Sequence, residues 1–160
     1  MRVLRRLTVL LAGTLLLAAA DGEATIIVQQ GIAGVELHMT KSQVRSLLGE
    51  PPRIRRGRNL FGPFTQFVYP RLIVEFQRVP TVTALRTSSR LERTPTGVGV
   101  GSTEAQVKRR LPHVACETWS GHRQCILGKV LPGRTVTIFA LRSGRVSNII
   151  VGVVQEGRSP

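Results

Sequence analysis

With 160 residues, 42% of them hydrophobic, the chain is long and apolar enough to bury a core, which excludes a wholly disordered protein. It carries 23 lysines and arginines against 9 acidic residues, a formal net charge of +14 at pH 7, and such a basic chain attracts anions over a long range. Aromatic residues make up only 4%, so aliphatic side chains must fill the core, and this favours β-sheet.

The first twenty residues predict a secretory signal peptide that is not part of the fold. A basic start, MRVLRR, precedes an apolar run of 14 residues, which is shorter than the roughly 20 residues of a membrane-spanning anchor, the alternative interpretation. Small residues offer cleavage after residue 20, or after residue 24 as a second option. Removal of residues 1–20 takes away three arginines and no acid, which lowers the net charge from +14 to +11. We therefore expect a secreted or periplasmic, cell-envelope protein without a transmembrane segment in the mature chain.

Thr40 and Gln43 form a Thr-x-x-Gln pattern that predicts the start of a helix. In such a capping box, the threonine hydroxyl accepts from the backbone N–H three residues on, and the glutamine side chain reaches back to the threonine N–H. Apolar residues recur behind it at helical spacing, at Val44, Leu47 and Leu48. The pattern predicts a helix over 41–48 that ends at Gly49 and Pro51.

Four arginines gather in the stretch RIRRGR that follows, namely Arg53, Arg55, Arg56 and Arg58. Phe61 and Phe64 come directly after them. Because arginine forms bidentate hydrogen bonds with carboxylate and phosphate, we interpret this stretch as a loop that binds an acidic partner or an anionic surface. The alternative is a solvated loop whose two phenylalanines are buried in the core.

The chain has one tyrosine, Tyr69, and one tryptophan, Trp119, and both residue types are enriched at binding hot spots. Trp119 adjoins a Ser-Gly turn, where its side chain can be exposed. Tyr69 can equally pack on an edge strand. Both join the arginines and phenylalanines as candidate binding residues.

The stretch GVGVGSTEAQVKRRL at 97–111 raises the alternative of a phosphate-binding loop before a helix. The lysine of a P-loop is missing before Ser102, and this serine also stands where the dinucleotide fingerprint needs its third glycine. Thr103 and Gln106 repeat the capping box instead, so the stretch predicts a second helix over 104–111.

This stretch also repeats residues 34–49 at an offset of 63, with six identical residues. Gly99 and Gly101 correspond to Glu36 and His38, so the two copies could not share a phosphate cradle. β-branched runs separated by Gly, Pro and Ser turns follow both copies, and each set predicts three or four antiparallel strands.

Together these patterns predict an α+β fold in which two tandem helix-plus-antiparallel-sheet repeats form one concave sheet with the helices on one face. We expect the first repeat at 26–87 and the second at 97–154, with a connector at 88–96 and a tail at 155–160.

Cys116 and Cys125 are the only two cysteines, and in an exported protein an even number favours a disulfide. A Ser-Gly turn between them would place them across a hairpin. The alternative is a zinc site in which the two cysteines bind the metal together with His113 and His122. On a strand, residues three apart point to opposite faces, so we predict the disulfide, with no metal site and no cofactor.

The pattern Gly-Val-x-Leu-x-Met-Thr-x-x-Gln-Val-x-x-x-Leu-Gly-x-Pro, from Gly34 to Pro51, resembles the small lipoproteins of the outer-membrane β-barrel assembly machine. This pattern occurs twice in one chain that is predicted to be exported, and the second half adds a hairpin bounded by cysteines. For these reasons the chain is more similar to the β-lactamase-inhibitor protein family. The resemblance spans residues 31–153 and implies a tandem repeat whose concave sheet binds other proteins, without enzyme activity. The chain departs from both families because it lacks a lipid-acceptor cysteine, a disulfide in the first repeat and an acidic residue at 53–69, so no inhibitory residue is assigned.

We expect a non-enzymatic protein-binding module whose partner is another envelope or extracellular protein. No serine or cysteine stands with a histidine base and an orienting group at recognisable spacing, so no enzyme is expected. The alternatives are a basic binder of an anionic wall polymer or lipid surface, and an inhibitor of an extracellular hydrolase. Nucleic acid is not expected as a partner, because export argues against it.

Overall fold

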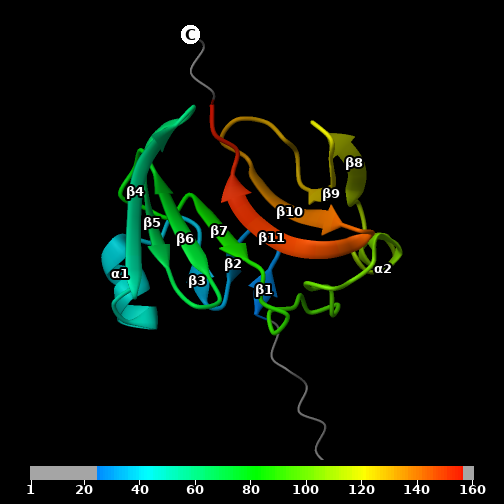
Figure 1. The fold of residues 1–160 in the computed structure, drawn as a ribbon, viewed down its shortest axis with the longest axis horizontal. Helices are drawn as coiled ribbons and strands as arrows, with labels where there is room; N and C mark the ends of the chain where they lie inside the picture. The colour runs from blue at the N-terminus through cyan, green and yellow to red at the C-terminus, as the bar shows by residue number, and fades with distance from the viewer. Residues whose placement is uncertain (1–24, 157–160) are drawn as a thin grey trace, which may run out of the picture.

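The structure, a computed structural model, describes residues 25–156, so the predicted signal peptide and most of the predicted tail lie outside the described residues. Its main element is an eight-stranded antiparallel sheet in the order β4-β5-β6-β7-β11-β10-β9-β8 (Figure 1). These strands are β4 (Arg53–Asn59), β5 (Gly62–Val68), β6 (Ile73–Gln77), β7 (Ala84–Thr87), β8 (Ala115–Trp119), β9 (His122–Leu127), β10 (Thr135–Arg142) and β11 (Arg145–Val153).

A second, small sheet consists of three strands of two residues each: β1 (Ile26–Ile27), β2 (Gly31–Ile32) and β3 (Val35–Glu36). Residues 25–156 form two helices, α1 at Lys41–Leu48 and α2 at Glu104–Arg110, and both are short and stand where the sequence predicts them. The described chain is therefore mostly β, which corrects the predicted α+β class. Neither helix has the length and the apolar run that crossing a bilayer requires.

Both helices begin at the predicted capping boxes. The backbone N–H of Gln43 donates to Thr40 Oγ1 at 3.2 Å, and the N–H of Thr40 donates to Gln43 Oε1 at 2.8 Å. Thr103 and Gln106 make the same pair of bonds at 3.2 and 2.8 Å. Each box satisfies two backbone donors that the first turn of a helix leaves without a partner.

The glycines before α2 shape the backbone that enters this helix. Gly97 and Gly101 have φ angles of +76° and +92°, in the left-handed region that favours glycine. A Cβ on Gly99 would lie only 2.7 Å from the carbonyl oxygen of Glu92, so a larger residue would force two backbone segments apart. The turn conformations and the close approach account for all three glycines.

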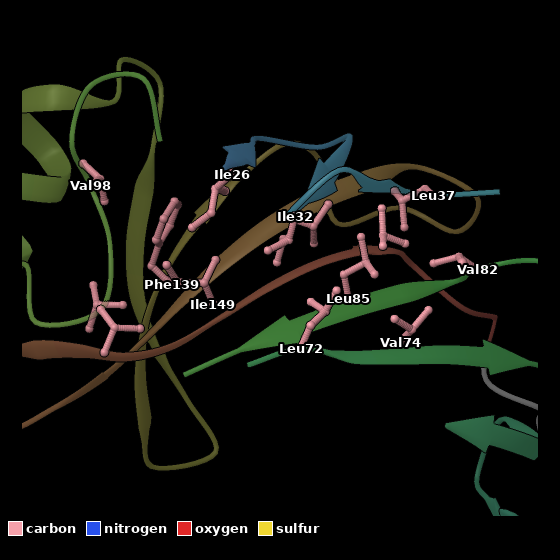
Figure 2. Close-up of a cluster of buried hydrophobic side chains, with 14 of the residues drawn as sticks. Ile26, Ile32, Leu37, Leu72, Val74, Val82, Leu85, Val98, Phe139 and Ile149 are labelled. Atoms are coloured by element: carbon pink, nitrogen blue, oxygen red, sulfur yellow. The ribbon is translucent and has the colours of Figure 1, made fainter. Parts of the chain in front are cut away.

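The core lies between one face of the large sheet and the elements that cover it (Figure 2). The small sheet contributes Ile26 and Ile32, which are fully buried, and each helix contributes one fully buried valine, Val44 or Val107. The large sheet contributes side chains that alternate along its strands and point into the core, among them Phe67, Val74, Phe76, Leu85, Phe139, Ile149 and Val151. The small sheet and both helices thus pack on the same face of the large sheet.

Basic side chains of α1 lie over two core aromatic rings. The guanidinium carbon of Arg45 is 4.7 Å from the ring centre of Phe67, and Lys41 Nζ is 5.2 Å from that of Phe76. The two rings meet edge to face with their centres 4.9 Å apart. Cation–π contacts of this kind stabilise by about 0.5–1 kcal/mol at exposed sites, so they help to hold α1 on the sheet.

The arginine-rich stretch is strand β4, at one edge of the large sheet, and not the predicted loop. It pairs with β5 along its whole length, from Arg53 opposite Val68 to Asn59 opposite Gly62. Ile54 is its one side chain packed against the core. Because polar residues occupy both faces of the strand, the period-2 alternation that predicts a strand is absent.

β7 and β11 pair at the centre of the large sheet and join the strands that follow α1 to those that follow α2. Leu85 stands opposite Val151, and Thr87 stands opposite Ile149. All four of these side chains are buried, so the junction is part of the core. The described chain therefore builds one continuous large sheet.

Candidate binding surface

The face of the large sheet that points away from the core carries a hollow of about 200 Å³. It lies over β4, β5, β6, β7 and β11. We call the following residues, which line it, the open-face patch: Arg55, Gln66, Ile73, Glu75, Ala84, Arg86 and Ile150. Alternation along each strand places them here, because their sequence neighbours Ile54, Phe67, Val74, Leu85, Ile149 and Val151 point into the core.

Two cross-strand rows build the open-face patch. In one row, Arg55 stands opposite Gln66, which in turn stands opposite Glu75. Gln66 Nε2 donates to Glu75 Oε2 at 2.6 Å, which holds the carboxylate in place. In the other row, Arg86 stands between Ile73 of β6 and Ile150 of β11. The patch therefore combines two guanidinium groups with apolar side chains and with one carboxylate, Glu75, that is held by an amide.

Arg55 and Arg86 are exposed, and neither forms an ion pair within residues 25–156. Their guanidinium donors therefore remain available to a ligand. Arginine pairs with carboxylate and phosphate through two parallel hydrogen bonds, while Ile73 and Ile150 offer apolar contact beside them. The arrangement suits an acidic group carried on an apolar or peptide framework.

The remaining arginines predicted as binding residues lie beside this patch on β4. Arg53 shares the open face with Arg55, whereas Arg56 and Arg58 alternate to the other face of the strand, as Ile54 does. All four arginines are exposed, and none forms an ion pair in the described part of the chain.

The structure separates the four predicted aromatic residues. Phe61 and Phe64 are half-buried and lie outside the core cluster, and the Phe64 ring lies against Gly57 of β4, where a Cβ would be 2.7 Å from it. Tyr69 packs against the core and its hydroxyl donates to the carbonyl of Gly49 at 2.9 Å, at the end of α1. Burial, with the nearby Glu50 carboxylate, raises the pKa of Tyr69. Trp119 is 69% exposed on β8, at the opposite edge of the large sheet.

The sequence did not predict three residues of the patch as binding residues: Gln66, Glu75 and Arg86. In IVEFQ the buried Val74 and Phe76 alternate with Ile73 and Glu75, so the pattern could have placed Glu75 on the face away from the core. No local signal brings Arg55, Glu75 and Arg86 together, because strand order decides that.

Cys116 and Cys125 form the predicted disulfide, as directly opposed residues of β8 and β9. Their Cα atoms are 3.9 Å apart, and Cys125 is fully buried. Both sulfur atoms are consumed by this bond, so the zinc site with His113 and His122 is ruled out in the oxidised protein.

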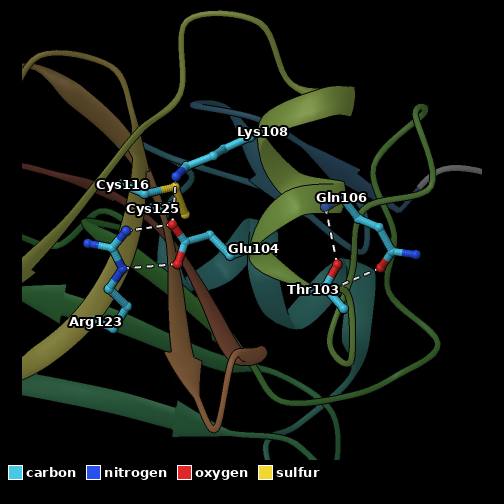
Figure 3. A network of polar contacts seen from close by, with 7 residues as sticks. All are labelled: Thr103, Glu104, Gln106, Lys108, Cys116, Arg123 and Cys125. Carbon is cyan, nitrogen blue, oxygen red and sulfur yellow. Dashed lines mark hydrogen bonds and ion pairs between the residues drawn. A yellow bond between two sulfur atoms is a disulfide. The ribbon is translucent and has the colours of Figure 1, made fainter.

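Glu104, the first residue of α2, links this helix to the disulfide-bonded hairpin (Figure 3). Arg123 of β9 donates from Nε to Glu104 Oε2 at 3.0 Å, and Lys108 Nζ lies 2.7 Å from Oε1. The hydrogen bond from Arg123, followed by the one from Lys108, lowers the pKa of Glu104 from 4.5 to about 2. A carboxylate in the first turn also complements the positive end of the helix dipole.

The lowered pKa predicts a specific loss of stability in acid. A carboxylate that binds protons less readily in the folded than in the unfolded chain stabilises the fold above pH 4.5, and this contribution disappears as the pH falls towards about 2. We expect Glu104→Gln to be less stable than the unmodified protein at pH 6. The difference should shrink steadily from pH 5 to pH 2 in urea titrations.

Glu117 is the matched control for this prediction, since it is exposed on β8 and forms no ion pair in the described residues. Glu117→Gln should follow the unmodified protein at every pH. A constant difference between Glu104→Gln and the unmodified protein across this range would contradict the proposed linkage.

No family model and no curated protein sequence matches this chain. Two solved structures resemble its fold. One is a DUF4309 family protein, YjgB, from Bacillus subtilis, with a TM-score of 0.53, 17% identity, and coverage of 81% of this chain and 88% of that protein. The other is an extracellular protein containing an SCP domain from Bacillus anthracis, with a TM-score of 0.51 and 10% identity.

The match to the SCP-domain protein covers 73% of this chain but only 44% of that protein, so the chain spans less than half of its length. At these identities the likeness concerns the fold alone. The resemblance to β-lactamase-inhibitor proteins and to the assembly-machine lipoproteins finds no support in these comparisons. The chain shares its fold with YjgB and with part of the SCP-domain protein.

Proposed function

We propose that the protein is an exported, non-enzymatic module that binds another envelope or extracellular protein through the open-face patch. The observation that carries the proposal is the hollow on the open face, where two exposed guanidinium groups without an ion pair flank apolar side chains. The predicted signal peptide and the disulfide support export, and so does the fold similarity to an extracellular Bacillus anthracis protein.

The composition of the patch favours a protein partner over an anionic surface. A polymer or lipid headgroup needs positive charge alone, whereas Ile73, Ile150 and the Gln66–Glu75 pair add shape and hydrogen-bonding groups. Binding hot spots in protein interfaces are enriched in arginine and lie in well-packed pockets. We therefore expect the partner's anchoring acidic side chain to pair with Arg55 or Arg86 at the rim of the hollow, away from the Glu75 carboxylate.

We also propose that the chain arose from a tandem repeat. Along the chain, each helix is followed by four strands of the large sheet. Phe76 and Phe139, which share the sequence offset of the two capping boxes, are both buried, with exposed fractions of 2% and 0%.

The test is a pull-down from envelope extract of the producing bacterium, on the immobilised oxidised protein, with elution by rising salt. We expect a protein that stays bound to about 0.5 M salt, where the screening length of charges is short. The double variant Arg55→Ala and Arg86→Ala should weaken its direct binding by about tenfold or more.

The matched control is the double variant Arg109→Ala and Arg134→Ala, which removes the same charge from exposed positions outside the patch. It should bind like the unmodified protein. Equal losses in both double variants, or release of only anionic polymer or lipid at low salt, would instead support the anionic-surface function. Inhibition of an extracellular hydrolase in a rate assay would favour the third alternative.

A further inference from the structure

Strand β4 forms an open edge of the large sheet. It pairs only with β5, so one row of backbone N–H and C=O groups along its seven residues has no strand partner in the described chain. An edge of this kind is a template to which another extended chain can be added. Six of the seven residues are exposed, so nothing in residues 25–156 buries the strand.

The charges along this edge show what could add to it. Arg53 and Arg55 lie on the open face, and Arg56 and Arg58 lie on the other, so guanidinium groups flank the edge on both sides of the sheet. A second copy of β4 is disfavoured as the added strand, because it would bring four more arginines to an edge that already carries four. Strand β8, at the other edge, contains one acidic residue, Glu117, and is a poor complement for four arginines.

We propose that an acidic, extended segment of the partner protein adds to β4 as a ninth strand. The proposal rests on the proposed function, since it requires that the partner is a protein. Main-chain hydrogen bonds would supply affinity, and carboxylates opposite the arginines would supply specificity. The segment would lie beside the open-face patch, because Arg55 belongs to both surfaces.

The spacing of the arginines specifies the sequence of the segment. They stand at positions 53, 55, 56 and 58, so the matching strand carries glutamate or aspartate in the order acid-x-acid-acid-x-acid. This order reads the same in both directions, so it fits a parallel or an antiparallel strand. Opposite charges that face each other across two strands contribute about 0.2–1 kcal/mol per pair.

The experiment measures binding of a fluorescent six-residue peptide, Glu-Thr-Glu-Glu-Thr-Glu with blocked ends, to the oxidised protein. A permuted peptide, Glu-Glu-Thr-Thr-Glu-Glu, has the same charge but the wrong spacing and should bind more weakly. Two further peptides keep the order and carry N-methyl groups, one on the odd and one on the even residues. Successive backbone N–H groups of a strand point to opposite sides, so only one of these two peptides loses the donors that face β4.

We expect one N-methylated peptide to bind about tenfold more weakly or worse, and the other to bind nearly as well as the unmodified peptide. Equal binding of all four peptides would show attraction by charge alone and would overturn strand addition. Failure of the unmodified peptide to bind better than the permuted one would overturn it as well.

Arg56→Ala separates this inference from the proposed function, because Arg56 lies outside the open-face patch. It should weaken the unmodified peptide several-fold, whereas the control Arg109→Ala should not. If the peptides do not bind as expected, but the double variant Arg55→Ala and Arg86→Ala still weakens binding of the captured protein, then strand addition is wrong and the proposed function stands. If the patch variants have no effect either, the proposed function fails too.

Discussion

Phe139→Ala is expected to lower the free energy of unfolding by about 3–5 kcal/mol, the usual cost of removing a buried aromatic side chain. Phe139 is fully buried on β10 and stands between Cys125 of β9 and Ile149 of β11, which are themselves fully buried. These neighbours belong to hydrogen-bonded strands and to a disulfide, so they cannot collapse into the space left behind. Urea denaturation of both proteins measures the loss.

Phe61→Ala is the control, since it removes the same side chain from the turn between β4 and β5, where it is only half-buried. We expect a loss of about 1 kcal/mol or less there. If Phe139→Ala lowered the free energy of unfolding no more than Phe61→Ala does, this result would contradict the position of the core between the two sheets.

The double variant Cys116→Ala and Cys125→Ala is expected to lose about 2–3 kcal/mol of unfolding free energy. The two residues are 9 positions apart, and the disulfide limits the freedom of this loop in the unfolded chain. The bond also fixes β8, an edge strand whose residues are mostly exposed, to β9. Denaturation in urea with and without a reductant gives the measurement.

Reduction of the unmodified protein should cause a similar loss, whereas the double variant should not respond to the reductant. This comparison separates the covalent bond from the packing of the sulfur atoms. A reductant that leaves the unmodified protein as stable as before would show that the bond does not stabilise the fold.

The helices and the disulfide were predictable because their causes are local. Thr40 bonds to Gln43, and Thr103 bonds to Gln106, each within one turn, so the pattern contains the whole interaction. The cysteines flank a short turn and are the only two in the chain. Such features depend little on how the rest of the chain folds.

The edge strand and the small sheet were missed for different reasons. β4 has arginines on both faces, and its pairing with β5 makes it a strand. The strands of the small sheet have two residues each, too few to show any alternation. The mostly β class followed from these elements, since both add strands without adding helices.

The open-face patch could be predicted only in part. Arg55 was a candidate because arginines cluster around it, but Glu75 and Arg86 come from β6 and β7. Their meeting depends on strand order and register, and a shift of one residue would turn Glu75 into the core. The sequence contains the alternation but not the register.

The pairing of β7 with β11 determines the order in which the sheet can form. Leu85 and Val151 meet across 66 positions of chain, whereas the hairpins on either side close over short turns such as the one between Asn59 and Gly62. Closing the longer loop costs more entropy, so we expect the two meanders to form before their junction. Until then β7 and β11 are exposed edges, and the high positive charge of the chain keeps such intermediates apart.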